Sequence, residues 1–291
     1  MTPGNFPQFK NMTQAESLAW MMAPSPQIRL TLTQGTPVTT ADVTGATSVF
    51  AEPFGGAIVP LFRDTAGKYP CIRKLAPSTL SLALGTLASG TIPNDVFAYD
   101  NNGSLGLEKL AWTSTTARAT AIDLVDGRYY KNGDYSRLHI GTFAPTATTT
   151  TADSALNRYL WNYYNSVEKL GAAAEGTSHA YTTGVWRYWN NSSTNSTMNF
   201  VAGLAGIIAL NVISQSGVTS GAGTVYVGLG LNVSGAPTGA DDQLGFSTGS
   251  LLYGGTAFKS SVLGLNDVGV YEYGVANGQF YSHTSQIRVR C

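Results

Sequence analysis

Short strand-like runs alternate with tight-turn dipeptides more regularly in residues 95–143 than anywhere else in the sequence. Asp126-Gly127 and Asn132-Gly133 are residue pairs that two-residue hairpin turns favour, because such turns need positive φ angles. The run Asp100-Asn101-Asn102-Gly103 predicts one more chain reversal. Strands joined by turns at roughly ten-residue spacing are typical of sandwiches and barrels. We therefore predict an all-β fold, a jelly-roll-like β-sandwich, in which residues 95–143 form a β-meander.

The sequence also predicts three segments of different character. Residues 1–27 form an extended N-terminal arm in which only 13–22 could make a short helix, residues 28–147 form a β domain, and residues 152–291 form a second β-rich unit, Gly-rich towards the C-terminus. A threonine tract between the last two favours extended or loop structure. Asp153-Ser154 predicts the N-cap of a short helical turn that runs into a strand. Further strands are expected at 202–212, 224–233, 268–275 and 279–290.

The charge content restricts the function classes. Charged residues are only 12% of the chain, against about a quarter in typical proteins. The 17 Lys and Arg balance the 17 Asp and Glu. Such a surface suits a protein covered by copies of itself or by partners, although a plain polar β-protein surface is the alternative. The chain has no Lys/Arg cluster, which argues against a nucleic-acid binder.

Two further segments bear on membranes and export. The most apolar run, residues 200–213, is shorter than the roughly 20 residues of a bilayer span, so we expect a buried strand and no membrane association. The first ten residues lack the apolar core that follows the basic region of a secretory signal, so we expect no export by that route.

The N-terminal arm carries apolar side chains that disordered tails avoid. The arm either packs on its own domain or lies across a neighbouring subunit. We expect the second arrangement, and with it a homo-oligomer, a trimer being one symmetry that would fit. The candidate interface residues are then Phe6, Phe9, Trp20, Met21 and Met22.

Two groups of residues could hold a ligand. Tyr159, Trp161 and Tyr163 share one face of a predicted strand and could stack on carbohydrate, although aromatic residues also fill cores and subunit contacts. The acidic turns at 100–103 and 241–242 could place oxygens around calcium, but neither has the twelve-residue loop that ends in Glu. Turns use the same residues for backbone reasons.

No motif for catalysis, a cofactor or a metal occurs in the sequence. His139, His179 and His283 lie far apart, and none has a second ligand two to four residues away. Cys71 and Cys291 are too few for a disulfide framework, and Cys291 either bridges two subunits or stays a free thiol. We therefore expect no enzyme, no cofactor and no metal.

Three segments resemble, in a fixed order, a family of uncharacterised virion proteins of tailed bacteriophages. They are residues 30–54 (LTLTQGTPVTTADVTGATSVFAEPF), the run 95–143 that begins DVFAYDNNGS, and residues 153–167 (DSALNRYLWNYYNSV). The resemblance covers roughly residues 28–191. It implies a β-rich, oligomeric particle component and transfers no catalytic residue. The chain departs from the family pattern at residues 53–60, where Phe54-Gly55-Gly56-Ala57 replaces a small basic turn.

The resemblance implies a place in the virion and a structural role. We expect an accessory or cement protein that decorates the capsid, with the major capsid protein as its partner. The alternative is a tail or head fibre protein that binds a carbohydrate receptor. A depolymerising enzyme is a third class, but acidic residues are too sparse for paired carboxylates to be identified.

Overall fold

A computed structural model describes residues 13–14, 18, 20, 25–75, 80–219, 225–233, 237, 243–246, 252–275 and 278–290, with the backbone alone at 206–219, 243–246 and 252–261. Of the predicted short helix, Thr13, Gln14, Leu18 and Trp20 are described, and the last three are helical. Apart from these and a 3-10 turn at Trp189–Asn191, the regular structure of the described residues is β. The all-β prediction is confirmed, and the several sheets are consistent with a sandwich.

The chain divides into two compact units. Unit 1 comprises the described residues of Met1–Asp153 together with Tyr159–Val167, and unit 2 comprises Ser154–Arg158 and Glu168–Arg290. The chain therefore passes from unit 1 to unit 2, back to unit 1, and again to unit 2. The sequence analysis assigns residues 159–167 to the second β-rich unit, because no local signal marks this return.

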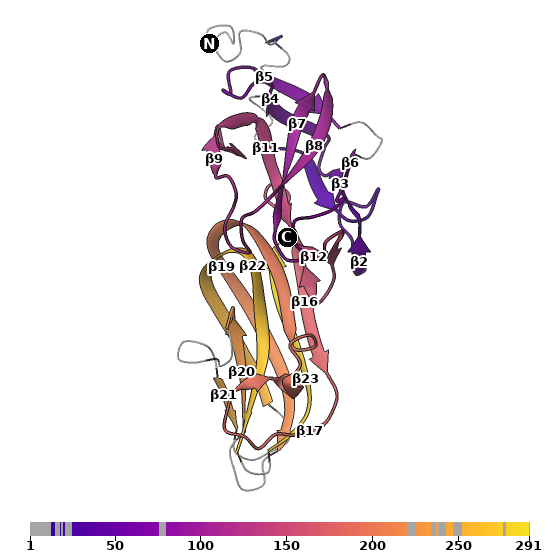
Figure 1. Cartoon of the computed structure of the whole chain (residues 1–291). Coiled ribbons are helices and arrows are strands. Elements are labelled where there is room, and N and C mark those ends of the chain that lie inside the picture. Colours follow the sequence, from indigo (N-terminus) through magenta and orange to yellow (C-terminus); the bar gives the residue numbers. More distant parts are fainter. Residues whose placement is uncertain are drawn as a thin grey trace. The chain divides into compact units, whose positions relative to one another are not determined.

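Unit 1 is built around one large sheet, with smaller sheets beside it (Figure 1). The main sheet has the strand order β8-β7-β11-β10-β9, and β15 pairs with β11. Its strands are β7 (Asn94–Asn101), β8 (Ser104–Ala111), β9 (Ile122–Val125), β10 (Arg128–Lys131), β11 (Asp134–Phe143) and β15 (Leu160–Asn162). The smaller sheets contain β1 (Ile28–Thr31), β3 (Ser48–Pro53) and β6 (Leu80–Ala83), and separately β4 (Ile58–Phe62) and β5 (Pro70–Lys74). A further group contains β2 (Val43–Ala46), β12 (Pro145–Ala147) and β13 (Thr150–Asp153).

The predicted turns are confirmed, but the meander is wrong. Asp126 and Gly127 have φ angles of 50° and 75° and join β9 to β10, as a two-residue hairpin requires. The turn after Asp100 also reverses the chain, with Asn102 at a φ of 50°. In a meander β8 would neighbour β9, whereas β11 pairs with β7 and leaves β8 at the edge. This pairing places apolar residues of β7 and β11 on one buried face.

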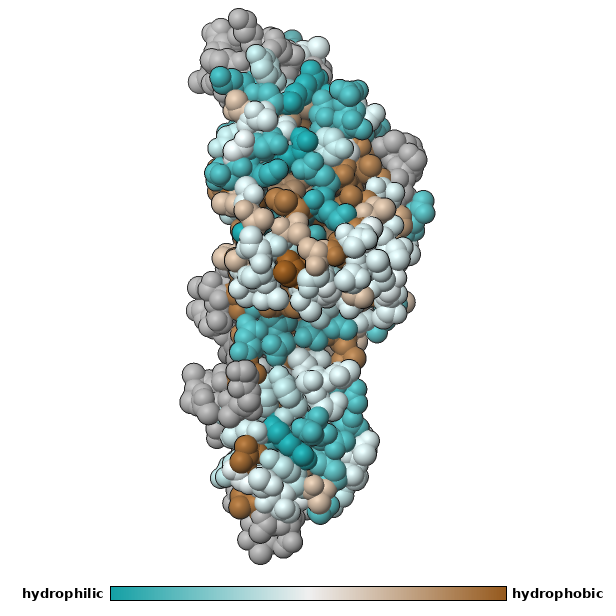
Figure 2. All heavy atoms as spheres, viewed as in Figure 1, coloured by the Kyte–Doolittle hydropathy of each residue, from teal (hydrophilic) through white to brown (hydrophobic). Residues whose placement is uncertain are grey.

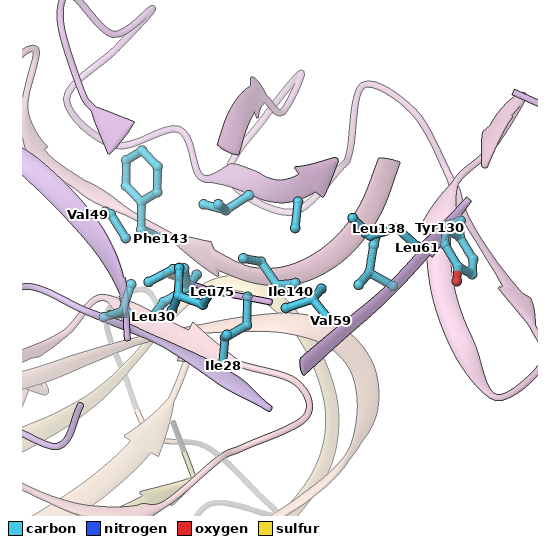
Figure 3. Close-up of a cluster of buried hydrophobic side chains, with 14 of the residues drawn as sticks. Ile28, Leu30, Val49, Val59, Leu61, Leu75, Tyr130, Leu138, Ile140 and Phe143 are labelled. Carbon is cyan, nitrogen blue, oxygen red and sulfur yellow. The ribbon is translucent and has the colours of Figure 1, made fainter. Parts of the chain in front are cut away.

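The core of unit 1 lies beneath the main sheet (Figure 3). Leu30 from β1, Leu61 from β4 and Leu138 from β11 are each at most 1% exposed. Ile28 and Ile140 join them in the same cluster. Since a fully buried aliphatic side chain contributes about 1.5–3 kcal/mol, this cluster holds the smaller sheets against the main one.

Unit 2 is dominated by two long paired strands (Figure 1). Its strands are β14 (Asn157–Arg158), β16 (Glu168–Glu175), β17 (His179–Ala180), β18 (Arg187–Tyr188), β19 (Thr197–Thr219), β20 (Val225–Leu231), β21 (Gln243–Phe246), β22 (Leu252–Gly274) and β23 (Gln279–Arg290). β22 lies between β19 and β20, and β23 pairs with both β19 and β16. The predicted strand at 279–290 is confirmed, whereas those at 202–212 and 268–275 are parts of longer strands.

The helical turn predicted after Asp153 is wrong. Residues 154–156 form a bend that leads into β14. The carbonyl oxygen of Ala155 accepts the Ala172 N–H, and that of Leu156 accepts the Asn199 N–H, each at 2.8 Å. These bonds to neighbouring strands satisfy the backbone groups that a helix would have used internally, so sheet pairing overrides the N-cap signal.

Among the described residues, no helix has the length and apolar character needed to cross a bilayer.

Candidate functional site

A row of aromatic rings crosses the face of the main sheet of unit 1 that points away from the core. We call it the unit-1 stripe. Neighbouring ring centroids lie 4.9–6.2 Å apart along the row. In order, its members are Phe97, His139, Trp161, Tyr163 and Tyr129.

Strand alternation places these rings on one face, because successive side chains of a strand point to opposite sides. His139 lies between Leu138 and Ile140, which both belong to the core. It is the register partner of Phe97 on β7. Trp161 follows the buried Leu160 in the same manner.

β15 can approach β11 closely because residue 141 is glycine. A Cβ atom at Gly141 would overlap the carbonyl oxygen of Trp161 and come within 2.7 Å of Leu30 Cδ1. Gly141 pairs with Asn162 in the register of these two strands. The missing side chain thus helps to fix where Trp161 stands on the sheet.

Exposure increases along the stripe. Phe97 and His139 are completely buried, whereas Trp161, Tyr163 and Tyr129 are partly exposed. Leu124, the register partner of Tyr129, is 59% exposed. The accessible part of the stripe is therefore its end at β15, β10 and β9.

The hydroxyl of Tyr164 supports this accessible end from beneath. It accepts the backbone N–H of Tyr129 at 2.9 Å, and its ring lies 4.7 Å from that of Tyr163. Burial raises the pKa of Tyr164, so the phenol stays neutral at physiological pH. Tyr163 and Tyr129 are thus held in place before any ligand arrives, which lowers the entropic cost of binding.

A buried polar cluster lies next to the closed end of the stripe. Asp95 accepts hydrogen bonds from the Thr142 hydroxyl at 2.7 Å and from Arg118 Nε at 2.8 Å. His139 Nε2 lies 3.1 Å from the same carboxylate. Burial by itself would raise the pKa of Asp95, but the nearby His139 and Arg118 outweigh it and hold that pKa below its usual value.

Thr142, His139 and Asp95 are residue types that occur in catalytic triads, but here their hydrogen bonds are not those of a triad. The Thr142 hydroxyl donates to Asp95, so the imidazole does not activate it as a nucleophile. All three side chains are at most 1% exposed, so no substrate can reach the hydroxyl. The cluster is a structural link between β7 and β11.

The structure brings together two of the three predicted ligand-stacking residues. Trp161 and Tyr163 contact each other, at a centroid distance of 6.0 Å. Tyr159 precedes β15, and its carbonyl oxygen accepts the Ala144 N–H. Sequence reasoning missed Tyr129 and His139 as their neighbours. A strand was predicted at Tyr129, but its pairing with the 159–164 segment could not be read from the sequence.

The predicted interface residues lie mostly outside the described part of the chain. Trp20 is described and belongs to the core of unit 1, with its ring 5.1 Å from that of Phe62. The guanidinium of Arg128 sits 4.5 Å above the Trp20 ring. At this residue the arm packs on its own unit, which is the alternative that the sequence left open. Phe6, Phe9, Met21 and Met22 lie outside the described residues.

Of the remaining residues that could bind calcium or form a disulfide, Asp100 and Cys71 are described. Asp100 pairs with Arg73 and caps its own turn by accepting the Gly103 N–H, so its carboxylate is already satisfied. Residues 241–242 and Cys291 lie outside the described residues, while Cys71 is a buried free thiol. In the described part of the chain, no group of three or more His, Cys, Asp or Glu side chains could hold a metal ion.

Comparisons with known proteins do not place the chain in a family. No protein-family profile matches, and no curated protein matches either. Similar solved structures include BuGH86 in complex with neoagarooctaose (TM-score 0.23, 10% identity, covering 91% of this chain and 34% of that chain). They also include a structure of infectious bursal disease virus, Gx strain (TM-score 0.29, 10% identity, 93% and 76%). Latent PorU from Porphyromonas gingivalis is a third (TM-score 0.27, 9% identity, 70% and 24%). The chain spans about a third of the length of BuGH86. Similarities at these TM-scores carry no argument about function.

Proposed function

We propose that the chain is a non-enzymatic structural component of a tailed-phage virion. Its role is that of an accessory protein that binds the capsid as an oligomer and decorates it. The resemblance of residues 28–191 to phage virion proteins supports this class. The observation that carries the proposal is that arginines of this weakly charged chain form ion pairs within their own unit.

Arginines of both units are paired with carboxylates of their own unit. Among the described residues at least six arginines form such pairs, at distances of 2.5–3.8 Å. They are Arg63, Arg73, Arg118, Arg137, Arg187 and Arg288. Figure 2 shows hydrophilic areas, near-white areas of intermediate hydropathy and separate hydrophobic areas on the viewed face.

Such a surface suits a protein that is covered in its working state. Charged residues are only 12% of the chain, and large apolar side chains remain exposed, including Leu124, Leu170 and Val185 at 44–59%. A decoration protein of this kind stabilises a shell by mass action, because each contact exists only in the assembled state.

The direct test is the composition of purified particles. Particles from an infected culture are separated on a density gradient, and their proteins are quantified by mass spectrometry against the major capsid protein. We expect the chain at a fixed ratio that survives repeated purification. Its absence from particles that contain all other structural proteins would overturn the proposal.

A receptor-binding fibre is the second candidate, and the unit-1 stripe favours it. Trp161 on β15, Tyr163 just after it and Tyr129 on β10 present partly exposed rings. Aromatic faces pack against the apolar face of a sugar ring, and Tyr hydroxyls supply hydrogen bonds at its edge. The ligand class would be a neutral glycan of the cell surface.

A further inference from the structure

Three neighbouring strands of unit 2 carry oxygen-bearing side chains in one row. Asn157 on β14 is the register partner of Asn199 on β19, and Asn199 is the register partner of Asp267 on β22. β19 lies between the other two strands. Register partners point to the same face of a sheet, so the two amides and the carboxylate stand side by side. The Asn199 Nδ2 donates to Asn157 Oδ1 at 3.1 Å, as this arrangement requires.

The row lies on the face of the sheet that points away from the hydrophobic interior. Met198 and Phe200, on either side of Asn199, are completely buried. Successive side chains of a strand alternate between the two faces, so Asn199 and its partner Asp267 point the other way. Thr197 is two residues before Asn199 and therefore shares its face.

Two polar atoms on this face are buried and have no hydrogen-bond partner among the described residues. They are Asp267 Oδ2 and Thr197 Oγ1, and Thr197 is only 7% exposed. The register partner of Thr197 is Gly269, so Thr197 and Asp267 are diagonal neighbours across β19 and β22. Buried polar atoms of native proteins nearly always have a partner, in the protein or in a bound ligand. Two orphaned oxygens at neighbouring positions therefore indicate one ligand that bridges them.

Asp267 differs from the buried carboxylates Asp95 and Glu272. Each of those pairs with an arginine, Arg118 or Arg187. Burial raises the pKa of Asp267, and no positive charge of the described residues opposes this effect. A carboxylate that is withdrawn from water without a counter-charge is unfavourable. The missing partner of Asp267 is thus a cation.

We propose that this place is a binding site for a calcium ion. Its ligands are the Asp267 carboxylate, the Thr197 hydroxyl and the Asn199 side-chain oxygen. The Nδ2 of Asn199 points to β14, which leaves its Oδ1 on the side of β22. All three ligands are hard oxygen atoms, which suit calcium better than zinc or copper. Calcium accepts irregular sets of carboxylate, carbonyl and water oxygens, whereas magnesium demands a near-ideal octahedron.

The spacing of the ligands fits an ion between them. In an antiparallel pair, opposite residues have Cβ atoms about 4.5–5.5 Å apart, and diagonal ones about 7–8 Å. Oxygens of short side chains at such positions can both reach an ion at about 2.3–2.6 Å. Asp267 is partly exposed, so an ion can enter from solvent and keep water on its open side.

Two rings close the other side of the site. The rings of Tyr188 and Tyr271 stack at a centroid distance of 4.7 Å. They lie where a side chain at residue 269 would stand, because this residue is glycine. The Thr197 end of the site is therefore shielded from water, which strengthens the attraction between an ion and its ligands.

Only one of the three ligands is acidic. The site therefore agrees with the absence of groups of three or more His, Cys, Asp or Glu side chains that could hold a metal in the described residues. Sequence reasoning expected no metal, because Thr197 and Asn199 are far from Asp267 along the chain. Affinity for calcium depends on the number of charged ligands, and weak protein sites have Kd values of about 10⁻⁴ to 10⁻³ M. We expect this range.

Isothermal titration of the full chain with calcium chloride, after dialysis against a chelator, tests the site. Thr197→Val removes the hydroxyl at nearly constant shape, and Asp267→Asn removes the charge. We expect each substitution to weaken calcium binding at least tenfold. Glu168→Gln is the matched control, because it also removes one carboxylate from unit 2, and it should bind calcium as the wild type does.

Thermal unfolding separates a lost ligand from a damaged fold. Without calcium, Thr197→Val should melt at or above the wild-type temperature, because it removes a buried hydroxyl that has no partner. Added calcium should raise the melting temperature of the wild type and of Glu168→Gln, but not that of Thr197→Val. A Thr197→Val variant that melts well below the wild type without calcium would overturn the inference, because the hydroxyl would then have a partner within the chain.

Three results of the titration would also overturn it. The first is a wild-type chain that binds no calcium up to about 10 mM, ten times the upper end of the expected range. The second is binding that Thr197→Val and Asp267→Asn both retain, which places the ion elsewhere. The third is equal weakening by Glu168→Gln, which makes the charge of unit 2 as a whole the cause. The decoration role is independent of all three, since particle composition tests it.

Discussion

The Trp189 indole packs edge-on against the imidazole of His283, with ring centroids 5.1 Å apart and both side chains enclosed in the core of unit 2. His283 Nε2 contacts the Ser196 hydroxyl at 3.3 Å. Burial lowers the pKa of His283 to about 4, although the nearby Glu175 acts in the opposite direction. The core therefore holds a neutral histidine.

This histidine makes the fold sensitive to mild acid. In the unfolded chain His283 takes up a proton near its ordinary pKa of about 6.5, while the folded chain does so only near pH 4. The unfolded state thus binds more protons between these values, and the free energy of unfolding falls as the pH falls through that window. We expect a loss of about 3 kcal/mol, since one pKa unit corresponds to about 1.4 kcal/mol. Urea unfolding at a series of pH values measures it.

The matched variant is His283→Phe, which has a similar ring and cannot titrate. Its stability should change much less between pH 6.5 and 4 than that of the wild type. The hydrogen bond from Asn195 helps to lower the pKa of Glu175 to about 2. The stability that this carboxylate contributes is therefore lost only as the pH falls below 4.5. An unchanged slope in the His283→Phe variant would contradict the assignment.

Asp95→Asn should strongly destabilise unit 1. The substitution removes the counter-charge of Arg118 in a site where Asp95 is 1% exposed. Breaking one side of a buried ion pair typically costs about 3–5 kcal/mol. Glu168→Gln is the control, because its pair with Arg288 is exposed at both ends and should contribute less than about 1 kcal/mol. Chemical denaturation of both variants compares them, and equal effects would contradict the expectation.

Gly127→Ala should destabilise the β9–β10 hairpin for conformational reasons alone. Gly127 has a φ of 75°, and an added Cβ would meet nothing within 4 Å. The left-handed conformation costs an L-residue about 1–2 kcal/mol, so we expect a loss of that size in denaturation midpoints. Gly176→Ala, which also meets nothing within 4 Å but lacks a positive φ, should be nearly neutral. A comparable loss in both variants would point to another cause.

Trp161→Ala tests the fibre alternative. On an array of neutral glycans, the wild-type chain should bind at least one member if the unit-1 stripe is a receptor site. An aromatic contact contributes up to about 1.5 kcal/mol beyond its buried area, so its loss should weaken binding about tenfold. Tyr281→Ala, at an aromatic ring of unit 2 that is 43% exposed, should bind as the wild type does. Absence of wild-type binding to every glycan would exclude this role for the stripe.

Local signals predicted the fold well, and long-range pairings did not follow from them. The turn at Asp126-Gly127 is set by its own residues, which is why the sequence reveals it. The pairing of β7 with β11 joins strands separated by more than thirty residues, and no local pattern distinguishes it from a meander. The long strand β22 begins well before the strand predicted at 268–275, and Gly264, at a φ of 82°, lies at a bulge within it.

In the candidate site too, local features were predictable from the sequence and long-range contacts were not. Strand alternation is a local property, and it suffices to predict that Trp161 and Tyr163 share one face. Their partners Tyr129 and His139 come from strands that meet them only in three dimensions, so the extent of the stripe was not predictable. The ring contact between Trp186 and Tyr273 in unit 2 was missed because these residues lie 87 residues apart in the sequence (273 minus 186).

The path of the chain interleaves the two units along the sequence. Residues 154–158 belong to unit 2 but precede a segment of unit 1, and their carbonyl groups accept the N–H groups of Ala172 and Asn199. A gene fragment that began at residue 168 would leave those donors without acceptors. A cut at any single point between the two units would therefore remove residues 154–158 from unit 2, residues 159–167 from unit 1, or both.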